Sequence, residues 1–145
     1  MRILDEDAAE AAAPLRLSRV AWAGPLSVVT SLAGVHAVRY IGLQMPGVRR
    51  DSFALGWTAV TADTVVLCTL AVIVFTLTCA FYDRPFPRFR FIASGALLVS
   101  FLPILATPQI GNLQTIATVG AMHVAAYVPC VTLLPALVAG RGRSA

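Results

Sequence analysis

The sequence predicts an all-α integral membrane protein, a four-helix bundle whose helices run up, down, up and down across the bilayer. Three observations carry this prediction. The chain is 58% hydrophobic and only 12% charged, about half of the roughly 25% charged residues of a soluble domain. Long apolar runs alternate with short polar loops, and most arginines gather at the ends of those runs. Too few polar side chains are present to cover the surface, so lipid must cover part of it.

The first two apolar runs span about residues 20–43 and 53–82. At about 1.5 Å per residue, roughly 20 helical residues cross a hydrocarbon core of about 30 Å, so each run can span a bilayer. Gly24 and Gly34 in the first run allow a neighbouring helix to approach closely. The second run contains one acid, Asp63, and an ionisable group at such a position is costly enough that we expect it to have a role.

The other two apolar runs span about residues 91–107 and 115–139. Proline removes a helical hydrogen bond, so Pro103 predicts a bend near residues 99–103. Such a bend would widen the bundle toward the outer side of the membrane. The connecting loops are short, which favours antiparallel neighbours and a single membrane domain over residues 18–140.

Both ends of the chain, residues 1–17 and 141–145, are predicted to be cytoplasmic tails. Cytoplasmic segments of membrane proteins carry an excess of basic residues. The first loop holds only Arg49 and Arg50, and the third loop holds no arginine. The segment before the first run, the second loop and the C-terminus together hold eight arginines: Arg2, Arg16, Arg19, Arg84, Arg88, Arg90, Arg141 and Arg143. The chain is therefore predicted to be a multi-pass protein of the cell membrane.

Composition and motifs argue against several classes of function. All 11 basic residues are arginine, which is typical of a high-GC bacterial genome, and they are too scattered to form a nucleic-acid surface. Cys68, Cys79 and Cys130 lie in apolar runs without metal-ligand spacing, so we interpret them as small buried hydrophobic residues. No nucleotide-binding, metalloprotease or hydrolase motif is present. We therefore expect neither a metal site nor a cofactor.

Two short motifs in the second half of the chain resemble a family of small four-span bacterial membrane proteins classed as a domain of unknown function. The motifs are SFLP at residues 100–103 and MH at residues 122–123. The resemblance covers the third and fourth runs by sequence and the first two by layout. It implies the four-span topology and draws attention to Pro103 and His123, and it carries no activity or catalytic roles.

Several polar side chains are predicted to share one depth near the outer boundary of the membrane. Counting about 20 residues from each arginine-marked edge places Arg39 and Asp63 at that boundary. His36 and His123 lie about one turn inside it, and His36 shares a helix face with Arg39 because the two are three residues apart. The other candidates for contacting a ligand are Gln109, Asn112 and Gln114, just above this depth on the third loop, and Tyr127, which lies deeper on the helix face of His123.

Two interpretations of this layer are open. In the structural one, Arg39 forms an ion pair with Asp63 that joins the first two helices, because either charge alone would be costly in a low-dielectric site. His123 then donates a hydrogen bond to a neighbouring carbonyl. In the functional one, Asp63, His123 and Arg39 surround a polar pocket in the outer half of the bundle.

Three functions fit these interpretations. The first is a non-enzymatic accessory or binding module that holds a lipophilic molecule, a lipid or a partner helix. The second is a cofactor-independent cyclase or isomerase for a polyketide or isoprenoid, with Asp63 or His123 as general acid or base and Arg39 stabilising negative charge. The third is a proton-coupled exporter, which would need an oligomer because four helices leave little room for an aqueous path. The sequence favours the first and leaves enzymatic activity and oligomeric state open.

Overall fold

The computed structural model describes residues 17–106 and 112–139, and every regular element in these ranges is helical. Four of the helices are long and apolar enough to cross a membrane, which confirms the predicted all-α four-helix bundle. Two short 3-10 helices, marked η, accompany them. In chain order the elements are η1 (Leu17–Arg19), α2 (Val20–Gln44), η2 (Phe53–Leu55), α3 (Trp57–Phe81), α4 (Pro85–Ala106) and α5 (Leu113–Val138).

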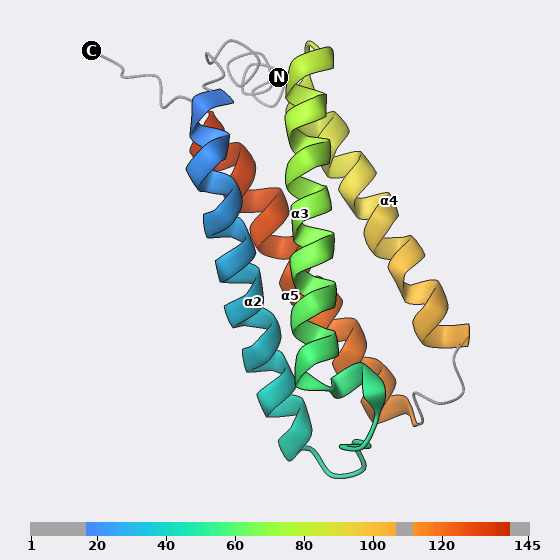
Figure 1. Cartoon of the computed structure of the whole chain (residues 1–145). Coiled ribbons are helices and arrows are strands. Elements are labelled where there is room, and N and C mark those ends of the chain that lie inside the picture. The colour runs from blue at the N-terminus through green and yellow to red at the C-terminus, as the bar shows by residue number, and fades with distance from the viewer. Residues whose placement is uncertain (1–16, 107–111, 140–145) are drawn as a thin grey trace, which may run out of the picture.

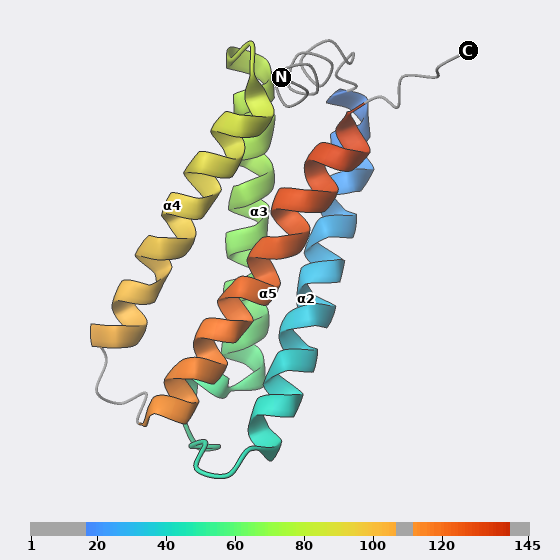
Figure 2. The ribbon, with the colours of Figure 1, turned by 180° about the vertical axis from the view of Figure 1, so that it is seen from behind.

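Consecutive helices are antiparallel, so α2 begins and α5 finishes at the same end of the bundle (Figure 1). We call this the terminal end, and the opposite end, where α2 finishes and α5 begins, the loop end. Figure 2 shows α2 and α5 side by side, and this pair has the most extensive contact in the bundle. By contrast, α4 diverges from α3 toward the loop end in both views.

Small residues make the close packing of α2 against α5 possible. A Cβ atom added at Gly42 would lie 2.2 Å from Cγ2 of Thr118, so any larger residue would require the Thr118 side chain or the helices to move. Farther along the same seam, the buried Ser31 hydroxyl donates a hydrogen bond to the carbonyl oxygen of Ala126 at 3.0 Å. Close helix approach through small residues, supplemented by interhelical hydrogen bonds, is the usual way membrane helices associate.

The buried side chains form two clusters, one toward each end of the bundle. The cluster at the terminal end is built around Phe75, whose ring meets Phe89 edge to face with centroids 5.0 Å apart. Cys68 and Cys130 are buried within it, as the sequence predicted, whereas Cys79 is only half-buried against it. The loop-end cluster includes the buried Leu55 and Met122. Asp63 and His123 line a cleft together with members of this second cluster, among them Val60 and Met122.

The helix boundaries differ from the predicted runs mainly in α4. The charged segment before Phe91 was predicted to be a loop, but α4 begins six residues earlier, at Pro85. Proline suits the first position of a helix because that backbone N–H has no helical partner. The side chain of Arg88 lies over the Tyr82 ring, 4.3 Å from its centroid. Arginines therefore mark the edge of an apolar run but not the end of a helix.

The second predicted run, residues 53–82, is divided by Gly56. Phe53–Leu55 forms the short η2 turn, and α3 begins only at Trp57. At Pro103 the helix is not interrupted, because α4 continues through this residue to Ala106. The divergence of α4 from α3 is already visible in its first half (Figure 1). The tilt of α4 away from α3 therefore widens the loop end.

Candidate functional site

A cleft lies between α3, α4 and α5 in the loop-end half of the bundle, where α4 has tilted away. Its volume is about 670 Å³, and Val35 of α2 contributes to the lining. Most of the lining side chains are apolar, among them Val60, Ile104 and Val119. This volume and lining are typical of small-molecule sites, which span roughly 300–1,000 Å³ and hold a few polar groups among hydrophobic ones.

Asp63 and His123 both line this cleft, from α3 and α5 respectively. Asp63 is exposed and has no hydrogen bond or ion pair with any residue in the described ranges. Nδ1 of His123 lies 2.9 Å from the carbonyl oxygen of Val119, one turn earlier on α5. A carbonyl oxygen can only accept, so Nδ1 carries the hydrogen, and when the ring is neutral Nε2 is left as a hydrogen-bond acceptor.

Two hydroxyl groups complete the polar lining of the cleft. Thr64 donates its hydroxyl hydrogen to the carbonyl oxygen of Val60 at 2.7 Å. Ser100 donates likewise to the carbonyl oxygen of Leu97 at 2.6 Å. Each hydroxyl has a single hydrogen, so both can offer only lone pairs to a ligand.

The predicted ion pair between Arg39 and Asp63 is not formed. Instead, Nε of Arg39 donates to the carbonyl oxygen of Leu55 at 2.6 Å, and its guanidinium lies 5.6 Å from the centroid of the Trp57 ring. Within the described ranges the ion pair that does occur joins Arg49 and Asp51, at 3.4 Å, in the exposed loop after α2. Arg39 is therefore satisfied by a carbonyl and an aromatic ring, outside the cleft.

Arg39 and Asp63 do not meet because of the way α3 is rotated about its own axis. His36 stacks on Trp57 with ring centroids 3.9 Å apart, and its Nε2 lies 3.0 Å from the hydroxyl of Thr61. The Trp57 and Thr61 side of α3 therefore faces α2. Each helical residue turns by about 100°, so Asp63, two residues beyond Thr61, points about 200° away. Counting residues along each helix predicted a depth for Asp63 but carried no information on the direction in which its side chain points.

The His36 ring is oriented by its contact with Thr61. The Thr61 hydroxyl donates to the carbonyl oxygen of Trp57 at 2.9 Å, so it accepts from Nε2 of His36. Nδ1 of His36 is buried and has no hydrogen-bond partner in the described structure. This cluster of His36, Arg39, Trp57 and Thr61 joins α2 to α3, which is a structural role.

The other candidates in the described part of the chain do not line the cleft. The hydroxyl of Tyr127 lies 2.7 Å from that of Ser94 and links α5 to α4. Asn112 caps α5 by accepting from the backbone N–H of Thr115 at 3.1 Å, and Gln114 lies against Gly47. Gln109 falls outside the described residues.

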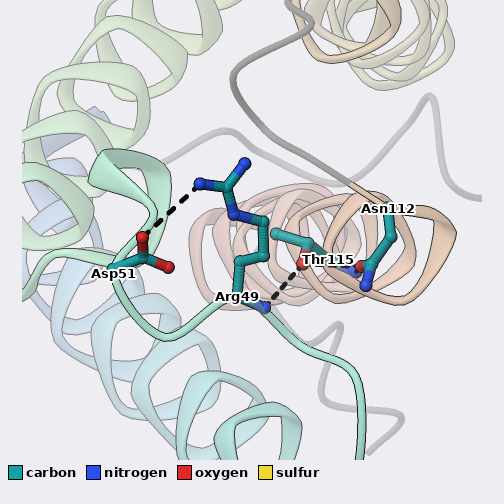
Figure 3. A network of polar contacts seen from close by, with 4 residues as sticks. All are labelled: Arg49, Asp51, Asn112 and Thr115. Atoms are coloured by element: carbon teal, nitrogen blue, oxygen red, sulfur yellow. Dashed lines mark hydrogen bonds and ion pairs between the residues drawn. The ribbon is translucent and has the colours of Figure 1, made fainter.

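Asn112 belongs instead to a clasp at the loop end. The backbone N–H of Arg49 donates to the buried hydroxyl of Thr115 at 3.0 Å, as Figure 3 shows. That hydroxyl donates in turn to Oδ1 of Asn112, whose Nδ2 donates to the carbonyl oxygen of Gly47. The clasp fastens the loop after α2 onto the first turn of α5.

Reasoning from sequence missed Thr64 and Ser100 as parts of the cleft. A signal was available for each: Thr64 follows Asp63 directly, and Ser100 opens the SFLP motif. Pro103 of that motif and both residues of the MH motif, Met122 and His123, also line the cleft. No group of three or more potential metal-ligating side chains occurs within the described residues.

Comparison of the chain with protein-family models, curated proteins and solved structures gave no match. The resemblance to the four-span family therefore stays a prediction.

Proposed function

We propose that the protein is a membrane-embedded binding module for a lipophilic molecule, held in the cleft between α3, α4 and α5. The observation that carries the proposal is the cleft itself: about 670 Å³, mostly apolar, with Asp63 and His123 among its lining. A plain structural bundle has no need of an acidic side chain facing such a space, because an ionisable group at membrane depth is costly.

The setting of the cleft supports a ligand that enters from lipid. Its lining includes Leu67 of α3 and Pro103 of α4, both exposed on helices that could cross a bilayer. A lipophilic molecule partitions into the bilayer first and needs only a short lateral movement to reach the cleft. We further propose that both chain ends are cytoplasmic, which puts the cleft in the outer half of the membrane.

Photolabelling tests the binding proposal directly. The protein is placed in phosphatidylcholine nanodiscs with dodecanol that carries a diazirine on its alkyl chain, and labelled residues are mapped by mass spectrometry. We expect saturable labelling of cleft residues on α3, α4 and α5 that unlabelled dodecanol suppresses. Labelling spread evenly over the lipid-facing surface of all helices, without saturation, would contradict the proposal.

A matched pair of variants controls for general lipid exposure. Ala62 is an exposed residue of α3 that lines the cleft, and Ala37 is an exposed residue of α2 that does not. Ala62→Trp should fill the cleft and reduce its labelling several-fold, whereas Ala37→Trp should leave labelling unchanged. Equal effects of the two substitutions would mean that the probe reports lipid contact only.

A second candidate is a membrane-embedded isomerase or cyclase, which the presence of Asp63 and His123 in one cleft favours. Arg39 has no part in this version, because it is bound to Leu55 and Trp57. Proton abstraction next to a carbonyl would be tested with 2-tridecanone in D₂O, by following deuterium incorporation beside the carbonyl. Wild-type protein should accelerate the exchange, and Asp63→Asn should not; an equal rate without protein would exclude this chemistry for the probe.

A further inference from the structure

The polar side chains of the cleft share one property: each presents an acceptor. Asp63, when ionised, has only lone pairs to offer. His123 has its Nδ1 hydrogen engaged by the carbonyl oxygen of Val119, which leaves the lone pair of Nε2 when the ring is neutral. Thr64 and Ser100 have their single hydroxyl hydrogens engaged by their own helix. The side chains of the cleft thus offer several acceptors and no free donor.

The distribution of charged residues around the cleft also favours a ligand that donates hydrogen bonds. The cleft lining includes one carboxylate and no arginine, and the chain contains no lysine. Arg39, the cation closest to this depth in the predicted layer, is held on the opposite side of α3 by Leu55 and Trp57. Asp63 therefore lacks a cationic partner within the described residues. A negative charge in a largely apolar site is stabilised only by a partner that brings positive charge or strong donors.

From this arrangement we propose that the ligand is a lipophilic amine, bound in its protonated form with its ammonium group against Asp63 and its alkyl or ring portion along the apolar walls. The ammonium hydrogens match the acceptors of Asp63, His123, Thr64 and Ser100, and charge-assisted hydrogen bonds are the strongest such contacts. A fatty acid would set its carboxylate against Asp63 with no donor to receive it. This inference rests on the proposed binding function and adds the chemical class of the ligand.

The test compares four competitors that share a twelve-carbon chain against the dodecanol photoprobe in phosphatidylcholine nanodiscs. Dodecylammonium has charge and donors, dodecyltrimethylammonium has charge alone, dodecanol has a neutral donor, and laurate has a negative charge. We expect dodecylammonium to compete about tenfold or more better than dodecanol, as a charged hydrogen bond would give. Dodecyltrimethylammonium should be weaker than dodecylammonium, and laurate the weakest.

Two variants test whether the preference for dodecylammonium over dodecanol arises in the cleft or in the bilayer. Asp63→Asn should remove the advantage of dodecylammonium over dodecanol while dodecanol still binds, and Ala37→Trp should preserve that advantage. Laurate competing as well as dodecylammonium, equal competition by the two cations, or an unchanged preference in Asp63→Asn would each overturn the inference. If the photoprobe labels the cleft but the preference is absent, only the ligand class fails; if the photoprobe does not label the cleft, the binding function fails with it.

Discussion

Arg39 donates its Nε hydrogen to the carbonyl oxygen of Leu55 at 2.6 Å, and this bond joins the final third of α2 to the turn that precedes α3. Leu55 is almost completely buried, so its carbonyl would otherwise have little access to water. The bond gives both groups a partner. Asp63 is not involved in it and lines the cleft on the far side of α3. The stability of the bundle and the chemistry of the cleft should therefore depend on separate residues.

The first prediction concerns this separation. Arg39→Met keeps the aliphatic stem but removes a charged hydrogen bond and the contact with Trp57, so it should lower the free energy of unfolding by about 2 kcal/mol. Asp63→Asn should cost less than about 0.5 kcal/mol. Thermal unfolding in detergent measures both, and the double variant should show the sum of the two losses. If the double variant lost less stability than the two single losses added together, the result would indicate the Arg39–Asp63 ion pair that the sequence suggested.

Gly42 provides the second prediction. Gly42→Ala sets a Cβ atom 2.2 Å from Cγ2 of Thr118 and should force α2 away from α5, at a cost of about 1–3 kcal/mol. Gly95 is the matched control, because a Cβ added there has nothing within 4 Å. Gly95→Ala should be neutral or should stabilise α4 by up to about 1 kcal/mol, since alanine favours helix more than glycine does. If Gly42→Ala cost no more stability than Gly95→Ala, the close approach of α2 to α5 at Gly42 would not be required for stability.

The third prediction tests the loop-end clasp. Thr115→Val retains the shape of the side chain but leaves the backbone N–H of Arg49 without its acceptor, which should cost about 1–3 kcal/mol. Thr115→Ser retains the hydroxyl and should cost less. Amide hydrogen exchange of residues 45–52 should accelerate in the valine variant only. Unchanged exchange in that variant would mean that the loop is held by other contacts.

The fourth prediction concerns orientation. The two described chain ends lie at the same end of the bundle (Figure 1), so reporters fused at the N- and C-termini should report the same compartment. The arginine distribution predicts that this compartment is the cytoplasm. A C-terminal alkaline phosphatase should be inactive and a C-terminal green fluorescent protein should fluoresce. The reverse result would place the cleft in the cytoplasmic half of the membrane.

The sequence by itself determined the number, approximate length and antiparallel order of the helices. Hydropathy is a local property, and a run of about 20 apolar residues must form a helix because the bilayer offers no other partner for its backbone. The same counting placed Asp63 and His123 in the half of the bundle where both line the cleft. The sequence predicted the positions of the helix ends less well, because α4 begins at Pro85 and not at residue 91.

Only the tertiary structure decided which way each helix faces. In a soluble protein an apolar stripe identifies the buried face of a helix, but here lipid and protein interior are both apolar, so no such stripe distinguishes them. The hydropathy pattern therefore could not show which side of α3 faces α2, although Thr61 and Asp63 point about 200° apart around that helix. The packing of His36 and Arg39 against Trp57 and Leu55 sets that rotation, and in doing so it separates the arginine from the acid and gives Asp63 to the cleft.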